Sequence, residues 1–506
     1  MEKEAATPED THLFAESHPG IDYRELGNTG LLASQAGFGC YRVSAGIAGH
    51  ETALKKAILE GINLIDTSAN YADGNSEKLI GRVVSDLIST GELSRSQITV
   101  VSKVGYLQGR NYEFSQQRKA QGKAFKELVD FGEGLEHCIH PEFLEDQLAR
   151  SLERLQLSAL DFYLLHNPEY YLEWAHKNGI DLNAARTEYC RRIRSAFEYL
   201  EESVKKGRIR YYGVSSNTFP VPADHIEFTS LDSLWQIAES LSPDHHFRLI
   251  QLPLNLMEPG AVLEKNQPGG KSVLELASER KLAVLTNRPL NALAGQHLFR
   301  LADIEDMEQF STNDVIDAIR AVSRSEKKFL QGVLPGLDLE IPLRNRVTEQ
   351  LAIADILKHH WRHFGSYERW REVKQGHLLA RIRGVMEFLT PHRENIEGLP
   401  EWIEAHMALL NNALKAVESI YSQSVAIEAR RINRLISAAD PDWAKAPALS
   451  QRAIRAPRTT TGVNAVLVGM RRVEYVTDVL SELSRPGIQK PRVSSWEKMN
   501  DGRKTL

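Results

Sequence analysis

The sequence predicts an α/β fold, a parallel (β/α)8 barrel with a large α-helical insertion, and two observations support it. Short apolar runs rich in β-branched residues alternate with helical patterns, and the strand candidates are 36–40, 63–66, 98–103, 162–166, 212–215, 249–252, 283–286 and 465–468. The chain has 506 residues, 42% of them hydrophobic, whereas one such barrel needs only about 250. An added domain or a large insertion is therefore expected.

The segments between the strand candidates have helical periodicity. In ETALKKAILEG, Ala53, Leu54, Ala57 and Ile58 form one apolar stripe, and Gly61 supplies a stop signal. Eight strands that alternate with helices in this way indicate a TIM barrel.

The longest connection follows the seventh strand candidate and contains three long stretches with the periodicity of amphipathic helices. Because ALSQRAIRA resembles the end of a seventh barrel helix, we place the insertion between strand seven and helix seven. The predicted organisation is an N-terminal extension (1–20), the barrel (21–292 and 446–490), the insertion (293–445) and a C-terminal tail (491–506). The insertion is expected to cover the active site as a lid or substrate domain. The alternative is an assembly element on the opposite face, through which a homo-oligomer could form.

Composition excludes several function classes. The net charge is −5 and long basic runs are absent, so nucleic acid is not an expected partner. Three cysteines are too few for a disulfide framework, which favours a reducing compartment. No apolar run approaches the roughly 18 residues of a membrane span, and the acidic start MEKEAATPEDTH resembles no signal peptide. His359 and His363 have a spacing that can bind zinc, but no nearby acidic or cysteine pattern completes a site, so no metal is expected. We expect a soluble, cytoplasmic protein.

Four polar residues lie in or just after separate strand candidates: Asp66, Tyr71, Lys103 and His166. Parallel strands bring their carboxyl ends together at one face of a barrel, so these side chains should converge. An ammonium stabilises a nearby phenolate, and an aspartate keeps that ammonium protonated, which would make Tyr71 a proton donor. The imidazole of His166 can orient a carbonyl oxygen.

With these residues in view, the chain resembles the aldo-keto reductase family, whose catalytic tetrad is this Asp, Tyr, Lys and His. The segments that carry the resemblance are YRELGNTGLLASQAGFGCYRV, NYADGNSEKLIG, RSLERLQLSALDFYLLHNP, KKGRIRYYGVSS and NAVLVGMRRVEYV. They cover about residues 20 to 295 and 445 to 485 and leave the insertion unexplained.

The resemblance implies an extended nicotinamide cofactor across the strand ends. The implied contacts are Ser215, Ser216 (or Asn217) and Gln251 at the carboxamide; Gly39, Cys40, Tyr41 and Asp66 at the nicotinamide side; Asn287, Arg288, Pro289 and Leu290 after strand seven; Gly469, Met470 and Arg471 at a 2′-phosphate; and Tyr475 and Asp478 at the adenine. An arginine suits a phosphate, so NADPH is expected in preference to NADH. The family has a stacking aromatic residue after strand seven, but here Asn287 and Arg288 occupy that position, so stacking must come from elsewhere.

The expected function is reversible, NADPH-dependent reduction of an aldehyde or ketone to an alcohol, with Tyr71 as the general acid. The aromatic loops after strands three and four supply candidate substrate contacts, or else pack onto the insertion: Tyr106, Asn167, Tyr170, Tyr171 and Trp174. A rival expectation is a nucleotide-binding regulatory or scaffold protein with slow turnover, whose insertion docks a partner.

Overall fold

A closed parallel barrel forms the centre of the structure, a computed structural model that describes residues 5–132, 134–294, 297–303, 308–337, 339–390 and 396–504. Its strands, in order around the barrel, are β3 (Ala36–Gly39), β4 (Leu64–Asp66), β5 (Thr99–Val104), β9 (Leu160–His166), β10 (Ile209–Ser215), β11 (Phe247–Pro253), β12 (Ala283–Asn287) and β15 (Ala465–Val468). Each strand pairs in parallel with the next, and β15 pairs with β3 to close the ring. The predicted (β/α)8 barrel is confirmed.

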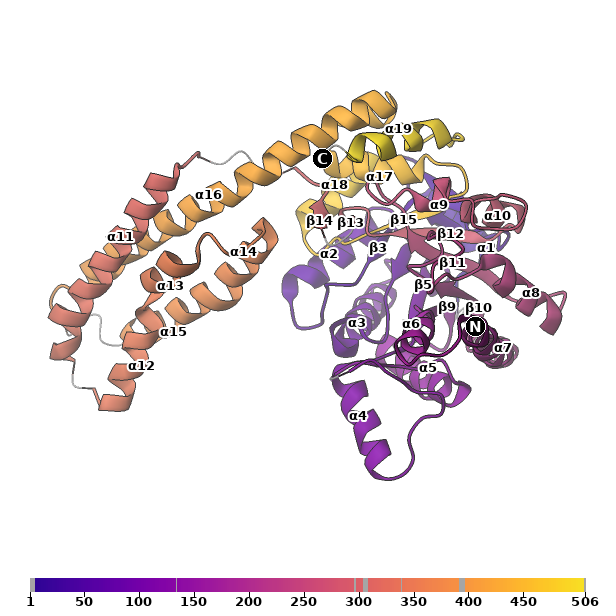
Figure 1. Cartoon of the computed structure of the whole chain (residues 1–506), viewed down its shortest axis with the longest axis horizontal. Coiled ribbons are helices and arrows are strands. Elements are labelled where there is room, and N and C mark those ends of the chain that lie inside the picture. Colours follow the sequence, from indigo (N-terminus) through magenta and orange to yellow (C-terminus); the bar gives the residue numbers. More distant parts are fainter. Residues whose placement is uncertain are drawn as a thin grey trace. The chain divides into compact units, whose positions relative to one another are not determined.

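A helix follows each barrel strand and covers its outer surface (Figure 1). These helices are α2 (Ala48–Leu59), α3 (Asn75–Ser89), α5 (Pro141–Leu155), α7 (Leu182–Lys205), α8 (Leu231–Leu241), α10 (Val273–Glu279), α17 (Leu449–Arg458) and α18 (Val473–Leu483). Local sequence sets their ends: α5 has Pro141 in its first turn, and Ser272 and Glu275 form a capping box at α10. Inside the barrel, side chains such as Leu64, Phe162 and Leu285 form the core.

Shorter elements decorate the barrel. They are α1 (Pro8–Glu16), β1 (Tyr23–Glu25), β2 (Leu32–Ser34), β6 (Tyr106–Leu107), α4 (Gly109–Ala120), β7 (Val129–Asp130), β8 (Glu136–His137), α6 (Tyr170–Lys177), α9 (Gly260–Leu263), β13 (Asn291–Ala294), β14 (His297–Arg300) and α19 (Val493–Arg503), with 3-10 turns η1 (Tyr71–Gly74), η2 (Arg95–Gln97) and η7 (Trp443–Lys445). β6, β8 and β7 form a small antiparallel sheet after β5. Residues 1–4 of the predicted N-terminal extension and 505–506 of the predicted tail lie outside the described residues.

The chain divides into two compact units: the barrel unit, Met1–Ala302 with Asn433–Leu506, and the helical unit, Asp303–Ile432. The helical unit contains α11 (Thr312–Lys328), η3 (Phe329–Val333), η4 (Leu334–Gly336), α12 (Ile341–Leu351), α13 (Ile353–His360), α14 (Tyr367–Val373), η5 (Lys374–Leu378), α15 (Leu379–Leu389) and most of α16 (Leu399–Ala439). Its buried side chains, among them Phe329, Trp370 and Trp402, form a hydrophobic core of their own.

Both ends of the long connection differ from the helical segment expected over 293–445. At its start, β13 and β14 pair as an antiparallel hairpin. At its end, Asp440, Asp442 and Trp443 belong to the barrel unit, where Arg492 pairs with both carboxylates and Trp443 packs on Trp496. Within the described part of the chain, no helix combines the length and the apolar character that crossing a bilayer requires.

Candidate active site

Three of the four predicted catalytic residues lie at the carboxyl ends of neighbouring barrel strands. Asp66 ends β4, Lys103 is the penultimate residue of β5, and His166 ends β9. Tyr71 begins η1, in the turn that joins β4 to α3. The structure therefore brings the four side chains together, as parallel strands in a barrel require.

A buried ion pair forms the floor of this site. Lys103 Nζ lies 2.7 Å from Asp66 Oδ2 and also donates to the carbonyl oxygen of Thr67 at 2.8 Å. Lys103 is fully buried and Asp66 is 4% exposed, so either charge would be destabilising in this site without the other. The same ammonium lies 3.4 Å from the hydroxyl oxygen of Tyr71 and 4.9 Å from the centre of its ring. Gln251 Nε2 donates to the second carboxylate oxygen of Asp66 at 2.8 Å.

The electrostatics of this cluster differ from the sequence-based expectation in the direction of the Tyr71 pKa shift. Burial raises the pKa of Tyr71, and the nearby Lys103 opposes that rise without cancelling it. Burial acts to lower the pKa of Lys103, but attraction to Asp66 and Tyr71 outweighs it, so the pKa is raised and the ammonium persists. Burial also raises the pKa of Asp66, against the pull of Lys103. Tyr71 is therefore protonated in the folded protein, and Lys103 moderates the effect of burial.

His166 is held by groups that the sequence did not single out. Its Nδ1 lies 3.1 Å from Ser68 Oγ, and its carbonyl oxygen lies 2.8 Å from His137 Nε2. A side chain at Gly105 would disrupt the second of these contacts, since a Cβ there would lie 2.5 Å from His137 Nε2 and 2.6 Å from the carbonyl oxygen of His166. Burial and the positive charge of Lys103 lower the pKa of His166 well below its usual value, so the ring is neutral. Its plane meets the Tyr71 ring edge-on, with the centres 5.9 Å apart.

A cavity of about 530 Å³ opens above this cluster, which is within the roughly 300–1,000 Å³ typical of small-molecule sites. Asp66, Tyr71 and His166 line it. Of the predicted cofactor contacts, those that line it are Gly39, Tyr41, Ser215, Asn217, Gln251, Asn287, Arg288, Pro289, Leu290, Gly469, Met470, Arg471 and Tyr475. Residues at or just after the ends of all eight barrel strands thus line this one cavity.

Residues at the predicted carboxamide position separate into two groups. Ser215 Oγ donates to Gln251 Oε1 at 3.1 Å beside the cavity. Ser216 does not line the cavity, because its hydroxyl is engaged with Thr218 and Thr229. Asn217, considered as its substitute, does line it.

The residues after strand seven supply polar groups where a stacking aromatic residue would be. The Oδ1 atom of Asn287 is buried without a hydrogen-bond partner among the described residues. Arg288 has a positive φ of 56° and pairs with Glu258 at 2.6 Å. Asn287 lines the cavity, and a buried acceptor without a partner beside a cavity fits a ligand with hydroxyl or amide donors, as a nicotinamide nucleotide has. The cavity lining therefore fits such a cofactor, held by hydrogen bonds at this position instead of by stacking.

Two predicted cofactor residues lie elsewhere. Asp478 accepts hydrogen bonds from Ser450 Oγ and Gln451 Nε2, which joins α18 to α17 instead of facing an adenine. Cys40 is fully buried and does not line the cavity; its thiol lies 3.6 Å from the carbonyl oxygen of Phe38.

The predicted substrate residues also separate into two groups. Tyr106, Asn167 and Tyr170 line the cavity, and Asn167 Nδ2 donates to the Tyr106 hydroxyl at 2.6 Å. Tyr171 and Trp174 do not line it: Tyr171 is buried beneath the guanidinium of Arg192, which lies 4.0 Å from its ring centre. Adjacent positions of α6 face different directions, so only one of the two tyrosines can reach the cavity.

Sequence reasoning missed several cavity residues. They are Arg42, Val43, Asn70, Gln108, Asn291, Leu293, Leu298, Arg300 and Leu467. Arg42 and Asn70 adjoin residues that were predicted, and adjacency in a strand-end loop could have indicated them. Leu298 and Arg300 lie on β14, within a segment expected to be helical.

Comparisons with known proteins relate part of the chain to one family. Residues 49–227 match the model of the Aldo/keto reductase family. The NADH-specific methylglyoxal reductase of Escherichia coli is 28% identical over 40% of this chain and 52% of that protein, so the chain spans about half the length of this relative. The NAD(P)H-dependent D-xylose reductase of Scheffersomyces stipitis is 25% identical over 53% of this chain and 76% of that protein. An aldo-keto reductase structure from Bacillus halodurans is 20% identical, covers 65% of this chain and 81% of its own, and has a TM-score of 0.34.

Proposed function

We propose that this protein, whose residues 49–227 match the model of the Aldo/keto reductase family, reduces an aldehyde or ketone to an alcohol with a reduced nicotinamide cofactor. The observation that carries the proposal is the buried Lys103–Asp66 pair, whose ammonium lies 3.4 Å from the Tyr71 hydroxyl. His166 faces the same cavity beside Tyr71.

When bound, the reduced nicotinamide supplies a hydride to the carbonyl carbon. Tyr71 and His166 would hold the carbonyl oxygen, which must lie about 3 Å from both side chains. A neutral His166 can donate a hydrogen bond to that oxygen without adding a positive charge. The hydrogen bond between Ser68 Oγ and His166 Nδ1 would fix the orientation of the ring.

Tyr71 would then protonate the developing alkoxide. A phenol with a raised pKa can still act as this acid, because an alkoxide is more basic than a phenolate. The ammonium of Lys103 would stabilise the phenolate that remains, and Asp66 would keep that ammonium charged. Gln251 would hold Asp66 in place through its Nε2, while its Oε1 accepts a hydrogen bond from Ser215 at the predicted carboxamide position.

NADPH is the proposed cofactor in preference to NADH. Arg471 lines the cavity in the turn between β15 and α18, and a guanidinium forms a planar, charge-assisted fork with a phosphate. The E. coli relative is named as NADH-specific and the Scheffersomyces stipitis relative as NAD(P)H-dependent, so cofactor choice is a property to measure in this chain.

A second candidate function is that of a nucleotide-binding regulatory protein whose helical unit docks a partner. Two observations favour it: Arg288 occupies the position of the stacking aromatic residue, and the helical unit has its own core. We propose the reductase in preference because Lys103, Asp66, Tyr71 and His166 lie together at the carboxyl ends of the barrel strands.

Turnover and cofactor affinity, measured together, distinguish the two functions. The full chain would be titrated with NADPH and NADH and then assayed for cofactor oxidation with a panel of small aldehydes that includes methylglyoxal and D-xylose. Reduction of at least one aldehyde at many turnovers per site supports the reductase. Tight cofactor binding with no turnover on any carbonyl compound would favour the regulatory protein.

A further inference from the structure

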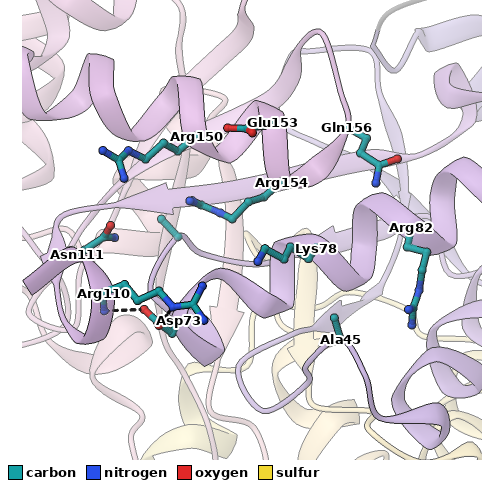
Figure 2. Close-up of a pocket in the computed structure, with 11 residues that line it drawn as sticks. Ala45, Asp73, Lys78, Arg82, Arg110, Asn111, Arg150, Glu153, Arg154 and Gln156 are labelled. Carbon is teal, nitrogen blue, oxygen red and sulfur yellow. Dashed lines mark hydrogen bonds and ion pairs between the residues drawn. The ribbon is translucent and has the colours of Figure 1, made fainter. Parts of the chain in front are cut away.

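A second cavity, of about 590 Å³, lies on the barrel unit outside the candidate active site. It is lined by η1, α3, α4 and α5 and by the loop after β3. Its residues are Ala45, Ala69, Asp73, Lys78, Arg82, Arg110, Asn111, Arg150, Glu153, Arg154 and Gln156 (Figure 2). Among the described residues that line it, two alanines are the apolar side chains, so it does not suit an apolar ligand.

The lining has more cationic than anionic side chains: five residues are cationic and two are anionic. Three carboxylates outside the lining, Glu51, Asp146 and Glu77, pair with Arg82, Arg150 and Arg154. Figure 2 shows the charged ends of Lys78, Arg110 and Arg154 grouped in one part of the view, whereas Arg82 points away from them.

The carboxylates near these cations leave donors available. Arg154 Nε lies 2.7 Å from the buried Glu77, which fixes the guanidinium in place. Arg110 Nε lies 3.2 Å from Asp73, and its side chain is 71% exposed. A guanidinium has five N–H donors, so one carboxylate leaves others free for a ligand. Lys78 has no ion pair or hydrogen bond with another described side chain.

The position of Arg154 is built into the fold. Gly74 has a φ of 81°, and a Cβ there would lie 2.9 Å from Arg154 Cδ. A residue with a side chain would therefore meet the arginine stem. This side of the cavity combines a fixed guanidinium on α5 with two exposed cations, Lys78 on α3 and Arg110 on α4.

We propose that this cavity binds a small anion that carries at least two phosphate or carboxylate groups. Three grouped cations match more than one negative charge, and the volume fits a small molecule instead of a polymer. The proposal is independent of the reductase function, since none of its cations lines the active-site cavity. The two cavities share one loop, however: Ala69 and Asp73 line this one, while Asn70 and Tyr71 line the other.

Isothermal titration calorimetry of the full chain tests the site, with pyrophosphate and citrate as probes and acetate as the singly charged comparison. We expect one equivalent of pyrophosphate or citrate to bind at least tenfold more tightly than acetate, and binding to weaken as sodium chloride is added. Pyrophosphate binding alone would indicate phosphate groups, and citrate binding alone would indicate carboxylates. Absence of binding for both probes at millimolar concentration would overturn the proposal.

Three variants locate the binding. Lys78→Glu with Arg110→Gln should weaken it about tenfold, and both side chains are exposed, so the fold should be retained. Lys205→Glu is the matched control, because Lys205 is an exposed lysine at the end of α7 that does not line the cavity. Arg471→Ala should leave the affinity unchanged. Equal weakening in the control, or loss of binding in Arg471→Ala, would place the anion elsewhere and contradict the proposal.

Discussion

At the scale of single residues, the proposed chemistry depends on the buried ammonium of Lys103, which would be destabilising in the barrel interior without its partners. Lys103 is fully buried, and among the described residues its ammonium is bound by Asp66, the carbonyl oxygen of Thr67 and the Tyr71 hydroxyl. The same pair therefore serves stability and catalysis, and these two roles can be separated by mutation.

Lys103→Met should abolish carbonyl reduction and lower the free energy of unfolding by about 3–5 kcal/mol, because it leaves the Asp66 carboxylate buried and unpaired. The double variant with Asp66→Asn removes that carboxylate and should recover much of the stability while staying inactive. Denaturant unfolding and turnover of the three proteins check this. Recovery of activity in the double variant would remove Lys103 from the proposed mechanism.

Arg471→Ala should weaken NADPH binding by roughly tenfold to a hundredfold, since a hydrogen bond between charged groups contributes about 1.5–3 kcal/mol. The affinity for NADH should change little, because NADH lacks the 2′-phosphate. Fluorescence titration with both cofactors measures the effect. Equal affinities for NADPH and NADH in the unsubstituted protein would contradict the proposed preference before the variant is made.

At the scale of elements, one buried carboxylate fixes the start of a helix in the helical unit. Glu326, on α11, accepts hydrogen bonds at 3.0 Å from the backbone N–H groups of Ile353 and Ala354, the first two residues of α13. Burial, with a smaller contribution from Asp355, raises the pKa of Glu326 from 4.5 to about 7. The free helix amides are thus capped by a group that resists ionisation.

The stability of the helical unit should consequently fall as the pH rises. A carboxyl group whose folded-state pKa exceeds its unfolded value contributes fully below pH 4.5, and the contribution is lost as the pH rises through about 7. The change amounts to roughly 3 kcal/mol over that range. Glu326→Gln keeps the accepting oxygen, so it should flatten the dependence and stabilise the unit at neutral pH.

Calorimetric unfolding of the full chain across this pH range measures that dependence. Glu349→Gln is the matched control, because Glu349 is exposed on α12. An unchanged pH dependence in Glu326→Gln would show that another group is responsible.

Barrel strands could be predicted from the sequence, but the hairpin β13–β14 could not. Parallel strands are covered on both faces and read as continuous apolar runs, as in Thr99–Val104, all of which is buried. Asn291–Ala294 and His297–Arg300 are four residues each and adjoin a long helical pattern, so periodicity over a longer window obscured them.

Sequence patterns also could not predict which side chains of helices and loops face the cavity. The sequence indicated that Asp66, Lys103 and His166 would converge, because strand ends in a parallel barrel must do so. It could not indicate that Tyr170 faces the cavity while Tyr171 does not, or that Asn217 does while Ser216 does not. Those differences depend on the direction of each side chain, which tertiary packing decides.

At the scale of the whole molecule, the helical unit should fold separately from the barrel unit. Replacing 303–432 with a flexible Gly/Ser linker should leave a folded barrel that binds NADPH, because each unit has its own core. We propose that the unit acts as a lid or substrate domain, so turnover or substrate selectivity should fall. Full activity on every substrate tested would instead favour an assembly role.

The position of the cut provides a control for that experiment. A wider deletion that extends through 445 also removes Asp440, Asp442 and Trp443, which Arg492 and Trp496 contact in the barrel unit. It should lower the melting temperature of the remaining barrel, whereas the cut at 432 should not. Similar melting temperatures for the two deletions would show that these contacts contribute little to the barrel.

Turnover by Tyr71→Phe tests the central claim most directly. The substitution removes one hydroxyl group, which lies 3.4 Å from Lys103 Nζ, and leaves the ring in place. With the cofactor saturating and its affinity measured in parallel, carbonyl reduction should fall by about 10²–10⁴-fold, as expected for loss of a general acid. Cofactor affinity should be nearly unchanged. Reduction at the rate of the unsubstituted protein would contradict the account.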